Sequence, residues 1–269
     1  MASRLAVAPA RDPALRHALG QHFLRSPRVV HAIMEAASIG SGDRVWEIGC
    51  GDGALTDPLW QCGQGLTLIE LDPALAQAAQ QRWPQMVLHQ GDAAQLLPRW
   101  SESSSAQSLP TVVVSNLPYS AATAILRAFF APAYVHTRMV LMFQREVARR
   151  IVGRESADRG PLSGIAPLLY DIRSVVRVPP GAFNPPPKVE SEVLAFRPRE
   201  DALALQVRQQ SEAYWRFLTR AFASRRKTLR NNLSELRGRP GYEALAAARP
   251  ESLVAQQLWE LYTSLRSGL

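Results

Sequence analysis

Four consecutive residues, Asn116-Leu117-Pro118-Tyr119, combine hydrogen-bond acceptors with an aromatic ring. This combination suits the exocyclic amine of adenine, whose lone pair is delocalised into the ring and which needs orientation more than a strong base. The side-chain oxygen of Asn116 can accept one amine hydrogen and the Leu117 carbonyl the other, so the nitrogen is drawn toward tetrahedral geometry. Pro118 fixes the backbone, and Tyr119 can stack on the base. These four residues are predicted to be catalytic.

An Asn-Leu-Pro-Tyr run by itself is also typical of a plain β-turn, so the catalytic interpretation depends on the motifs that precede it. Gly49, Gly51 and Gly53 lie between a strand-like and a helix-like run, where glycine lets the backbone approach a ligand closely. Glu70 ends the next strand-like run, 17 residues after Gly53. A carboxylate there can accept hydrogen bonds from both ribose hydroxyls of a nucleoside. The order of motifs predicts a nucleoside-containing cofactor beside the catalytic segment.

Two classes of cofactor compete for this turn. A dinucleotide fingerprint has the spacing G-x-G-x-x-G/A, and Ala54 gives a loose match to its last position. A pyrophosphate needs an anion site at the helix N-terminus, which the acidic side chains of Glu47 and Asp52 would oppose. S-adenosylmethionine has no phosphate and carries a sulfonium cation. The acidic turn therefore favours this methyl donor over a dinucleotide or a turn that binds no ligand.

Asp92 follows the third strand-like run, in Gln90-Gly91-Asp92-Ala93. At the carboxyl end of a strand its side chain can accept a hydrogen bond from the adenine amine of the cofactor. An Asp in this position is more often a turn or cap residue, so both interpretations stay open.

These motifs require a framework, and residues 27–200 alternate short β-like runs with helical ones. Strands are predicted at residues 44–48, 66–70, 86–89, 111–115, 138–143, 172–178 and 190–197. Helices are predicted at residues 27–37, 55–60, 73–82, 121–130 and 145–152, and loops at 98–110 and 179–188. Strands that alternate with helices favour a parallel sheet covered by helices, so the predicted fold class is α/β.

The composition changes after about residue 201, where the chain becomes rich in Leu, Ala, Arg and Gln. Its apolar residues, including Phe217, Leu218 and Leu229, have helical spacing. We therefore predict three parts: a flexible tail at residues 1–18, an α/β domain at 19–200 and a small helical domain at 205–269.

The chain is strongly basic, with a formal net charge of +8 and a pI of about 10.2. Residues 205–269 contain eleven Arg and Lys residues against five Glu, so they carry most of the excess. Such a balance suggests a polyanionic partner, although a solvated surface rich in arginine gives the same count. The candidate contacts form one cluster at Arg216, Arg220, Arg225, Arg226, Lys227 and Arg230 and a second at Arg145, Arg149 and Arg150.

The composition also argues against several classes of protein. No apolar run approaches the roughly 18–20 residues that a membrane-spanning helix needs. The stretch from Met1 to Leu19 contains no continuous apolar segment, so no secretory signal is predicted. Cys50 and Cys62 match no zinc spacing and no disulfide framework, which predicts a reducing, cytoplasmic setting and no metal site.

Motifs in one order give the chain a resemblance to the ribosomal RNA adenine dimethyltransferases from about Leu19 to Leu233. They are Gly20-Gln21-His22-Phe23-Leu24, Glu47-Ile48-Gly49, Glu70-Leu71-Asp72, Asn116-Leu117-Pro118-Tyr119, Gln144-Arg145-Glu146-Val147, the proline-rich run 178–189 and the basic run 225–231. That family uses S-adenosylmethionine to dimethylate two adjacent adenosines near the 3′ end of small-subunit rRNA. The resemblance implies a Rossmann-like class I methyltransferase domain and a small all-helical C-terminal domain.

The resemblance also implies roles for individual residues. Cofactor contacts are expected at Gln21, His22, Leu24, Gly49, Gly51, Glu70, Asp92 and Asn116. The target base is expected near Asn116 and Tyr119, with Phe183 as a second stacking face. RNA contacts are expected at Arg145, Arg149, Lys188, Arg225, Arg226, Lys227 and Arg230. The expected partner is small-subunit rRNA in a pre-ribosomal particle, bound by a monomer that takes part in small-subunit biogenesis.

Three positions depart from the pattern of the family. His22 stands where asparagine is usual, so an altered cofactor contact is expected rather than a lost one. Ser115 replaces a common glycine. Residues 159–163 are Arg-Gly-Pro-Leu-Ser instead of Tyr-Gly-Arg-Leu-Ser, which removes an aromatic ring and a cation and affects RNA docking rather than the chemistry.

Three other functions share parts of this pattern. Large-subunit rRNA adenine methylases of the macrolide-resistance type have the same fold and first motifs, but the proline-rich loop and the 225–231 run favour the small-subunit enzymes. A non-catalytic RNA-binding assembly factor would not need an intact Glu70, Asn116 and Tyr119. A nicotinamide-dependent oxidoreductase is not favoured because no catalytic acid–base set is visible.

Overall fold

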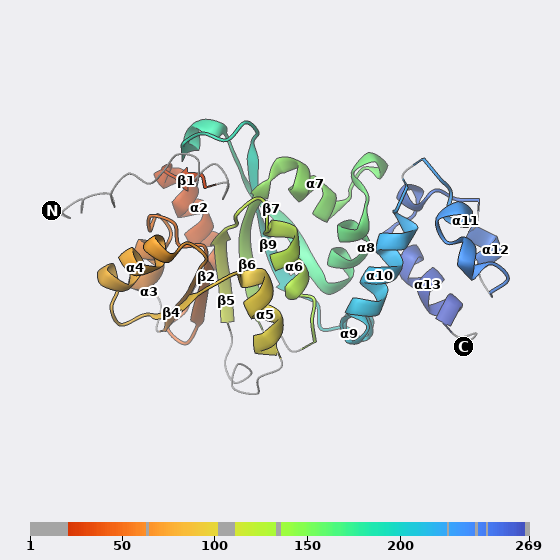
Figure 1. Ribbon diagram of the computed structural model, residues 1–269, viewed down its shortest axis with the longest axis horizontal. Helices are drawn as coiled ribbons and strands as arrows, with labels where there is room; N and C mark the ends of the chain where they lie inside the picture. Colours follow the sequence, from red (N-terminus) through yellow and green to blue (C-terminus); the bar gives the residue numbers. More distant parts are fainter. Residues whose placement is uncertain are drawn as a thin grey trace. The chain divides into compact units, whose positions relative to one another are not determined.

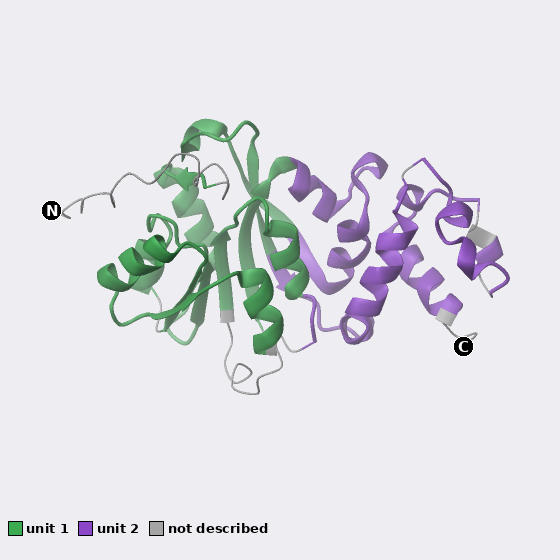
Figure 2. Cartoon of the chain, in the orientation of Figure 1, with its two compact units in different colours: residues 1–129, 133–145, 173–195 green, residues 130–132, 146–172, 196–269 purple. Residues whose placement is uncertain are grey.

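The computed structural model describes residues 21–62, 65–101, 111–132, 136–224, 226–239, 242–245 and 247–266 (Figure 1). The tail predicted at residues 1–18 lies outside these ranges. The chain divides into two compact units (Figure 2). Unit 1 contains residues 1–129, 133–145 and 173–195, and unit 2 contains residues 130–132, 146–172 and 196–269. This division differs from the boundary predicted at residues 200–205, because residues 146–172 group with the C-terminal helices.

A seven-stranded sheet has the order β4-β3-β2-β5-β6-β9-β7. Its strands are β2 (Arg44–Ile48), β3 (Leu66–Glu70), β4 (Val87–Gln90), β5 (Thr111–Asn116), β6 (Arg138–Gln144), β7 (Tyr170–Val178) and β9 (Ser191–Pro198). The first five strands in this order pair in parallel, as predicted. The centre of β5, Val112-Val113-Val114, is 0% exposed, and such continuous apolar runs are typical of parallel strands that helices cover on both faces.

β2 lies between β3 and β5, so the sheet is built outward from β2 on both sides. The chain first forms β3 and β4 on one side of β2 and then β5 and β6 on the other side. The loops after β2 and β5 diverge, and this divergence opens the crevice in which α/β sheets of this kind bind ligands. The three chemical motifs follow β2, β3 and β5, which border the crevice.

Helices join the strands of unit 1: α2 (Pro27–Ala37), α3 (Thr56–Cys62), α4 (Pro73–Arg82), α5 (Ala93–Ser101) and α6 (Ala122–Ala128). Both α2 and α4 begin at proline, and the Asp72 side chain caps α4 by accepting a bond from Ala74 N at 3.0 Å. α5 was not predicted, and its last four residues lie in the segment that was predicted to be a loop from residue 98. Buried Leu97 and the contact of Trp100 with Trp46 favour the helix over the local Pro and Ser signal.

A second, two-stranded sheet was not predicted, because strands of two residues show no periodicity. In it β1 (Phe23–Leu24) pairs antiparallel with β8 (Phe183–Asn184). The ladder continues through a bond from Arg25 N to Ala182 O at 2.7 Å. The ladder therefore fixes the first described segment of the chain against the proline-rich loop.

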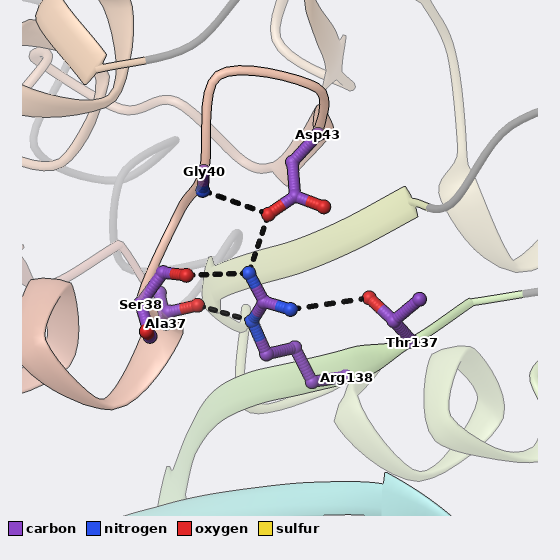
Figure 3. A network of polar contacts seen from close by, with 6 residues as sticks. All are labelled: Ala37, Ser38, Gly40, Asp43, Thr137 and Arg138. Atoms are coloured by element: carbon purple, nitrogen blue, oxygen red, sulfur yellow. Dashed lines mark hydrogen bonds and ion pairs between the residues drawn. The ribbon is translucent and has the colours of Figure 1, made fainter.

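Arg138, at the start of β6, joins three parts of unit 1 (Figure 3). Its guanidinium donates to Ala37 O and Ser38 O at the end of α2 and forms an ion pair with Asp43. Asp43 in turn accepts a bond from Gly40 N at 2.9 Å. The two carbonyls are among those that a helix end leaves without an intrahelical partner. Arg138 therefore holds the end of α2 and the turn before β2 against β6.

Unit 2 is mainly helical. Its helices are most of α7 (Arg145–Val152), then α8 (Pro161–Leu169), α9 (Ala202–Gln209), α10 (Ser211–Ala221), α11 (Leu229–Asn232), α12 (Tyr242–Leu245) and α13 (Ala255–Arg266). Tyr214 on α10 packs edge-on against Trp259 on α13, with ring centroids 4.9 Å apart. No helix in the described ranges is both long and apolar enough to cross a membrane.

α8, like α5, is a helix that the sequence analysis missed. Seven of its nine residues are buried, so its apolar residues surround the helix and produce no helical period. A Cβ atom on Gly164 would lie 2.7 Å from the Leu218 side chain, which shows how closely α8 and α10 pack. The Tyr214 hydroxyl also donates to Gly164 O at 3.0 Å. This packing explains why the segment around α8 groups with the C-terminal helices.

Candidate functional site

Most of the residues predicted to do chemistry line one cleft of unit 1, at the carboxyl ends of β2, β3 and β5. The Gly-rich turn leaves β2, Glu70 ends β3 and Asn116 ends β5, so parallel pairing brings three distant segments to one edge of the sheet. The predicted residues that line the cleft are Gln21, His22, Gly49, Gly51, Glu70, Asp92, Asn116, Leu117, Pro118 and Tyr119.

The turn between β2 and α3 depends on glycine for its conformation. Gly51 has a φ of 54° and Gly53 a φ of 92°, in the left-handed region that other residues rarely adopt. A Cβ atom on Gly51 would lie 3.1 Å from the Phe23 ring, and one on Gly53 only 2.6 Å from Trp83. The turn is packed against both rings, and the main chain of Gly51 forms part of the cleft wall.

Glu70 is held at the end of β3 by donors from neighbouring turns. Its Oε1 accepts a bond from Asp72 N at 2.9 Å, and its Oε2 accepts bonds from Gly51 N at 3.2 Å and the Cys50 thiol at 3.5 Å. Burial raises the pKa of Glu70, while Gly51 N–H and the Cys50 thiol lower it. Because a carboxylate oxygen can accept two bonds, Oε1 can still accept a hydroxyl from a ligand in the cleft.

Two acidic residues of the Gly-rich turn do not line the cleft, which corrects part of the sequence argument for the cofactor. Glu47 is 1% exposed, and burial raises its pKa to about 8, so it is largely neutral at pH 7. Asp52 forms an ion pair with Arg25. The turn therefore presents less negative charge to a ligand than its sequence suggests, and charge alone does not exclude a pyrophosphate.

Asn116 has its side-chain amide oriented by the chain itself. Its Nδ2 donates to His22 O at 3.0 Å, which leaves Oδ1 as the atom able to accept a hydrogen from a ligand. The preceding Ser115, where the family usually has glycine, donates its hydroxyl to Ile48 O at 2.5 Å. These bonds tie the end of β5 to the end of β2 and to the segment before β1.

Tyr119 and His22 form one aromatic edge of the cleft. The Tyr119 hydroxyl and Ser191 Oγ are 2.7 Å apart, and the two rings lie with their centroids 5.5 Å apart. His22 Nδ1 lies 2.9 Å from Pro185 O, so this nitrogen carries a hydrogen and donates it to the carbonyl. The histidine at this position therefore supports the tyrosine ring as well as offering a polar atom.

Asp92 combines the two interpretations that the sequence left open. Its Oδ1 accepts a bond from Ala94 N at 2.9 Å and its Oδ2 one from Gln95 Nε2 at 3.3 Å, so it caps α5. It also lines the cleft beside Gly91. The cap fixes the carboxylate at the rim, where an oxygen can accept a further bond.

Leu24 and Phe183 do not line the cleft, which corrects the stacking role predicted for Phe183. Leu24 is 2% exposed and Phe183 is 4% exposed, and both belong to the hydrophobic core around the β1–β8 ladder. Neither lines the cleft. In this structure Phe183 therefore offers no open ring face to a base, and Leu24 acts by packing.

Among the cleft residues that sequence reasoning did not identify as functional are Leu71 and Asp72. Leu71 lines the cleft and is 51% exposed, so it offers an apolar surface directly after Glu70. Asp72 accepts a bond from Gln21 Nε2 at 3.2 Å and so positions the N-terminal segment. Leu71 directly follows Glu70 in the sequence and Asp72 comes two residues after it. A leucine immediately after a strand-ending acidic residue is the signal that could have identified the first.

The predicted RNA-binding cations differ in their availability. Arg145 forms an ion pair with Glu190, and Arg149 pairs with Asp158 at 2.9 Å and with Glu155 at 3.4 Å. Arg225 lies outside the described residues. The remaining predicted contacts are exposed, namely Lys188, Arg226, Lys227 and Arg230.

Sequence similarity to known proteins extends over most of the chain. A family model described as ribosomal RNA adenine dimethylase matches residues 13–264. A curated protein from Syntrophotalea carbinolica, named ribosomal RNA small subunit methyltransferase A, is 42% identical over 80% of this chain and 80% of its own. A protein of the same name from Synechococcus elongatus is 36% identical over 93% of this chain and 95% of its own.

Solved structures share the fold. A dimethyladenosine transferase from Plasmodium falciparum has a TM-score of 0.75 at 22% identity, over 91% of this chain and 98% of its own. The 23S rRNA methyltransferase ErmE has a TM-score of 0.61 at 25% identity, over 91% of this chain and 99% of its own. The predicted Rossmann-like methyltransferase fold with a helical C-terminal part is confirmed.

Proposed function

The chain belongs to the ribosomal RNA adenine dimethylase family, and from this membership we propose how its cleft performs the reaction. The protein is an S-adenosylmethionine-dependent enzyme that dimethylates the N6 amine of adenosine in small-subunit (16S) rRNA. Its targets are two adjacent adenosines near the 3′ end of that RNA. One observation carries the assignment of the reaction to this cleft: the catalytic segment and the cofactor motifs line the same wall.

The donor set of the cleft fits S-adenosylmethionine. We assign Glu70 to the ribose hydroxyls, Asp92 to the adenine amine and the exposed Leu71 to an apolar face of the nucleoside. The Gly51 main chain, which packs against Phe23, allows close approach. When bound, the cofactor supplies a methyl group made electrophilic by its sulfonium. The other residues of the cleft orient the nucleophile and the base.

Asn116 orients the attacking amine in this proposal. Because its Nδ2 is bound to His22 O, its Oδ1 accepts one amine hydrogen and the Leu117 carbonyl accepts the other. Both oxygens also stabilise the positive charge that develops on the nitrogen, and the nitrogen then loses a proton to solvent. After one methylation a single amine hydrogen remains, so the second methylation uses one of the two acceptors.

Tyr119 holds the target base by stacking. Its ring is fixed at the hydroxyl end by Ser191 and along one edge by His22, so a base stacking on it loses less freedom than one on a mobile ring. The adenosine leaves its own stack to enter the cleft, while the protein recognises the rest of the RNA through shape and backbone.

The substrate is proposed to be rRNA within a pre-ribosomal particle, bound by a monomer. The exposed cations at Lys188, Arg226, Lys227 and Arg230 support contact with a polyanion. Small-subunit rRNA is the substrate named for the curated relatives, whereas ErmE, which shares the fold, is named for 23S rRNA.

The decisive experiment incubates the purified protein with S-adenosylmethionine and either undermethylated small subunits or large subunits, followed by mass spectrometry of the rRNA. We expect two dimethylated adenosines in the small-subunit RNA and none in the large-subunit RNA. Modification of the large-subunit RNA alone would favour the macrolide-resistance type of methylase. No modification of either RNA, together with no binding of the cofactor in calorimetry, would contradict the enzymatic assignment.

A further inference from the structure

A second hollow of unit 1 lies outside the cleft and is lined by three arginines, Arg25, Arg28 and Arg177. It has a volume of about 430 Å³, and the rest of its wall comes from the start of α2, the end of β7 and the segment 179–182. None of the residues predicted from the sequence to bind cofactor or RNA lines it. The hollow therefore concentrates positive charge at a place that the reaction described so far does not use.

Two of the three guanidinium groups are available for a ligand. Arg25 is paired with Asp52. Arg28 and Arg177 are exposed, and within the described ranges no side-chain hydrogen bond or ion pair joins either of them to another residue. Arginine presents a fork of donors that matches the oxygens of a phosphate group. Two unpaired arginines in one hollow therefore predict an anionic ligand with several oxygens.

The start of α2 adds one main-chain donor to the same hollow. Pro27 has no N–H and Val29 N donates to Ser26 O at 3.1 Å, which leaves the N–H of Arg28. Ser26 occupies the N-cap position, but its side chain makes no bond to the helix, and the first turn contains no acidic residue. Ser26, Arg28 and Val29 all line the hollow. No acidic side chain in the first turn therefore offsets the positive end of this eleven-residue helix, and such an end is suited to anions.

The hollow lies a short, fixed distance from the cleft. His22 lines the cleft and Arg25 lines the hollow, three residues apart in the segment that contains β1. At a rise of about 3.3 Å per residue, three extended residues span roughly 10 Å. The bond from Arg25 N to Ala182 O, at 2.7 Å, fixes that segment against the wall of the hollow. A strand of RNA with one base in the cleft can therefore bring a nearby phosphate to the arginines.

We propose that Arg28 and Arg177 bind a phosphodiester of the substrate RNA close to the target adenosine, with the main-chain N–H of Arg28 as a further donor. This inference rests on the proposed function, because it supplies a backbone contact for the same substrate. The contact would position the strand so that the flipped base reaches Tyr119 and Asn116. Phosphate contacts of this kind fix register and orientation and carry no sequence information.

The test compares the double variant Arg28→Gln/Arg177→Gln with the matched double variant Arg44→Gln/Arg99→Gln. The control pair is also exposed and lies in unit 1, with Arg44 at the amino end of β2, opposite the cleft. Methylation of undermethylated small subunits is measured over a range of salt concentrations, and cofactor affinity by calorimetry. We expect the first variant to raise KM for the subunits about tenfold, because a charge-assisted contact is lost.

The salt dependence of the same variant separates the proposal from a loss of folding. The slope of log(kcat/KM) against log salt should become shallower by about 0.7, because the two arginines together neutralise one phosphate and each neutralised phosphate of a single strand contributes about 0.7. The control pair and the cofactor affinity of both variants should stay at wild-type values. Binding of inorganic phosphate is measured by calorimetry in the same proteins. An unchanged KM and slope would overturn the proposal, and if the first variant had then lost only its binding of inorganic phosphate, the hollow would be a site for free phosphate. An inactive wild-type protein would instead contradict the proposed function.

Discussion

At the residue scale, the catalytic segment is defined by which atoms are already engaged. The amide nitrogen of Asn116 is bound to a carbonyl and the hydroxyl of Tyr119 to Ser191. The atoms left for a substrate are therefore an amide oxygen and a ring face. This division explains how a segment without a general base can act on an amine, since positioning and charge stabilisation are the only tasks it must perform.

Replacement of Asn116 tests this role. Asn116→Ala is expected to lower the rate of methyl transfer at least about 100-fold, because it removes an acceptor that acts on developing charge. RNA affinity should remain nearly unchanged. Single-turnover methylation of undermethylated small subunits measures the first effect and a binding titration the second. Asn116→Asp keeps an acceptor oxygen but cannot donate to His22 O, so its rate should be intermediate. An active alanine variant would refute the role.

Glu47 predicts a dependence of stability on pH. Its folded pKa of about 8 is above the ordinary value of 4.5, so the unfolded chain loses this proton first as the pH rises. The contribution of Glu47 to the free energy of unfolding is therefore constant below pH 4.5. Between pH 4.5 and about pH 8 it falls progressively, by as much as about 1.4 kcal/mol per pH unit. Glu47→Gln is neutral in both states and should lose this component.

Urea unfolding of the wild type and the Glu47→Gln variant at pH 5, 6, 7 and 8 measures the difference. The free energy of unfolding of the variant minus that of the wild type should grow with pH. Other titrating groups are common to both proteins and cancel in this difference. Parallel profiles would show that Glu47 is ionised in the fold.

At the scale of elements, short connections decide the geometry of the site. The β1–β8 ladder has two residues in each strand, yet it holds the segment that places His22 O on Asn116. The Arg138 network similarly fixes the end of α2, the helix whose start forms the basic hollow. The β1–β8 ladder and the Arg138 network both depend on hydrogen bonds between residues far apart in sequence. Neither of them contains a residue that is assigned to the reacting amine.

Arg138→Met is expected to destabilise the protein by roughly 2–4 kcal/mol, because it leaves Asp43 without its cation and two carbonyls without donors. Arg138→Lys keeps the charge but cannot reach all three acceptors, so its loss should be smaller. Arg44→Met, at an exposed position, serves as the control and should change stability by less than about 0.5 kcal/mol. Denaturant unfolding measures all three variants. Equal stability of the Arg138 and Arg44 methionine variants would contradict this role.

At the scale of the whole molecule, the net charge of +8 is not evenly available. Arg145, Arg149 and Arg150 are engaged with Glu190, Asp158 and Glu146 respectively. Other cations are exposed, among them Arg226, Lys227 and Arg230 in unit 2. Electrostatic attraction to RNA is expected to depend on this second group of exposed cations, because carboxylates of the protein compensate the charge of the three paired arginines.

Neutralising the second group tests this expectation. The triple variant Arg226→Gln/Lys227→Gln/Arg230→Gln should raise KM for undermethylated small subunits and reduce the salt dependence of kcat/KM, with cofactor affinity unchanged. The matched control, Arg197→Gln/Arg237→Gln/Arg249→Gln, removes three exposed cations of unit 2. If both triple variants behave alike, the effect is one of net charge, and the specific cluster is refuted.

The class of cofactor followed from the resemblance to the family, because the acidic side chains of the Gly-rich turn do not line the cleft in the structure. The sequence by itself determined the parallel strand–helix alternation and the positions of the motifs at strand ends. Each of these depends on local patterns, because hydrophobic period, turn residues and strand termini involve neighbours along the chain. Since carboxyl ends of parallel strands meet at one edge, the order of the motifs was enough to place Gly51, Glu70 and Asn116 in a single site.

Only the tertiary structure decided which predicted residues have free atoms and which are buried. Phe183 is in the core, Glu47 is largely neutral, and Arg145 and Arg149 are paired, because residues distant in sequence lie next to them. α8 and the basic hollow were not visible for the same reason: burial on all sides erases helical period, and Arg28 and Arg177 meet only when α2 and β7 pack. Contacts over long sequence separations leave no local pattern to detect.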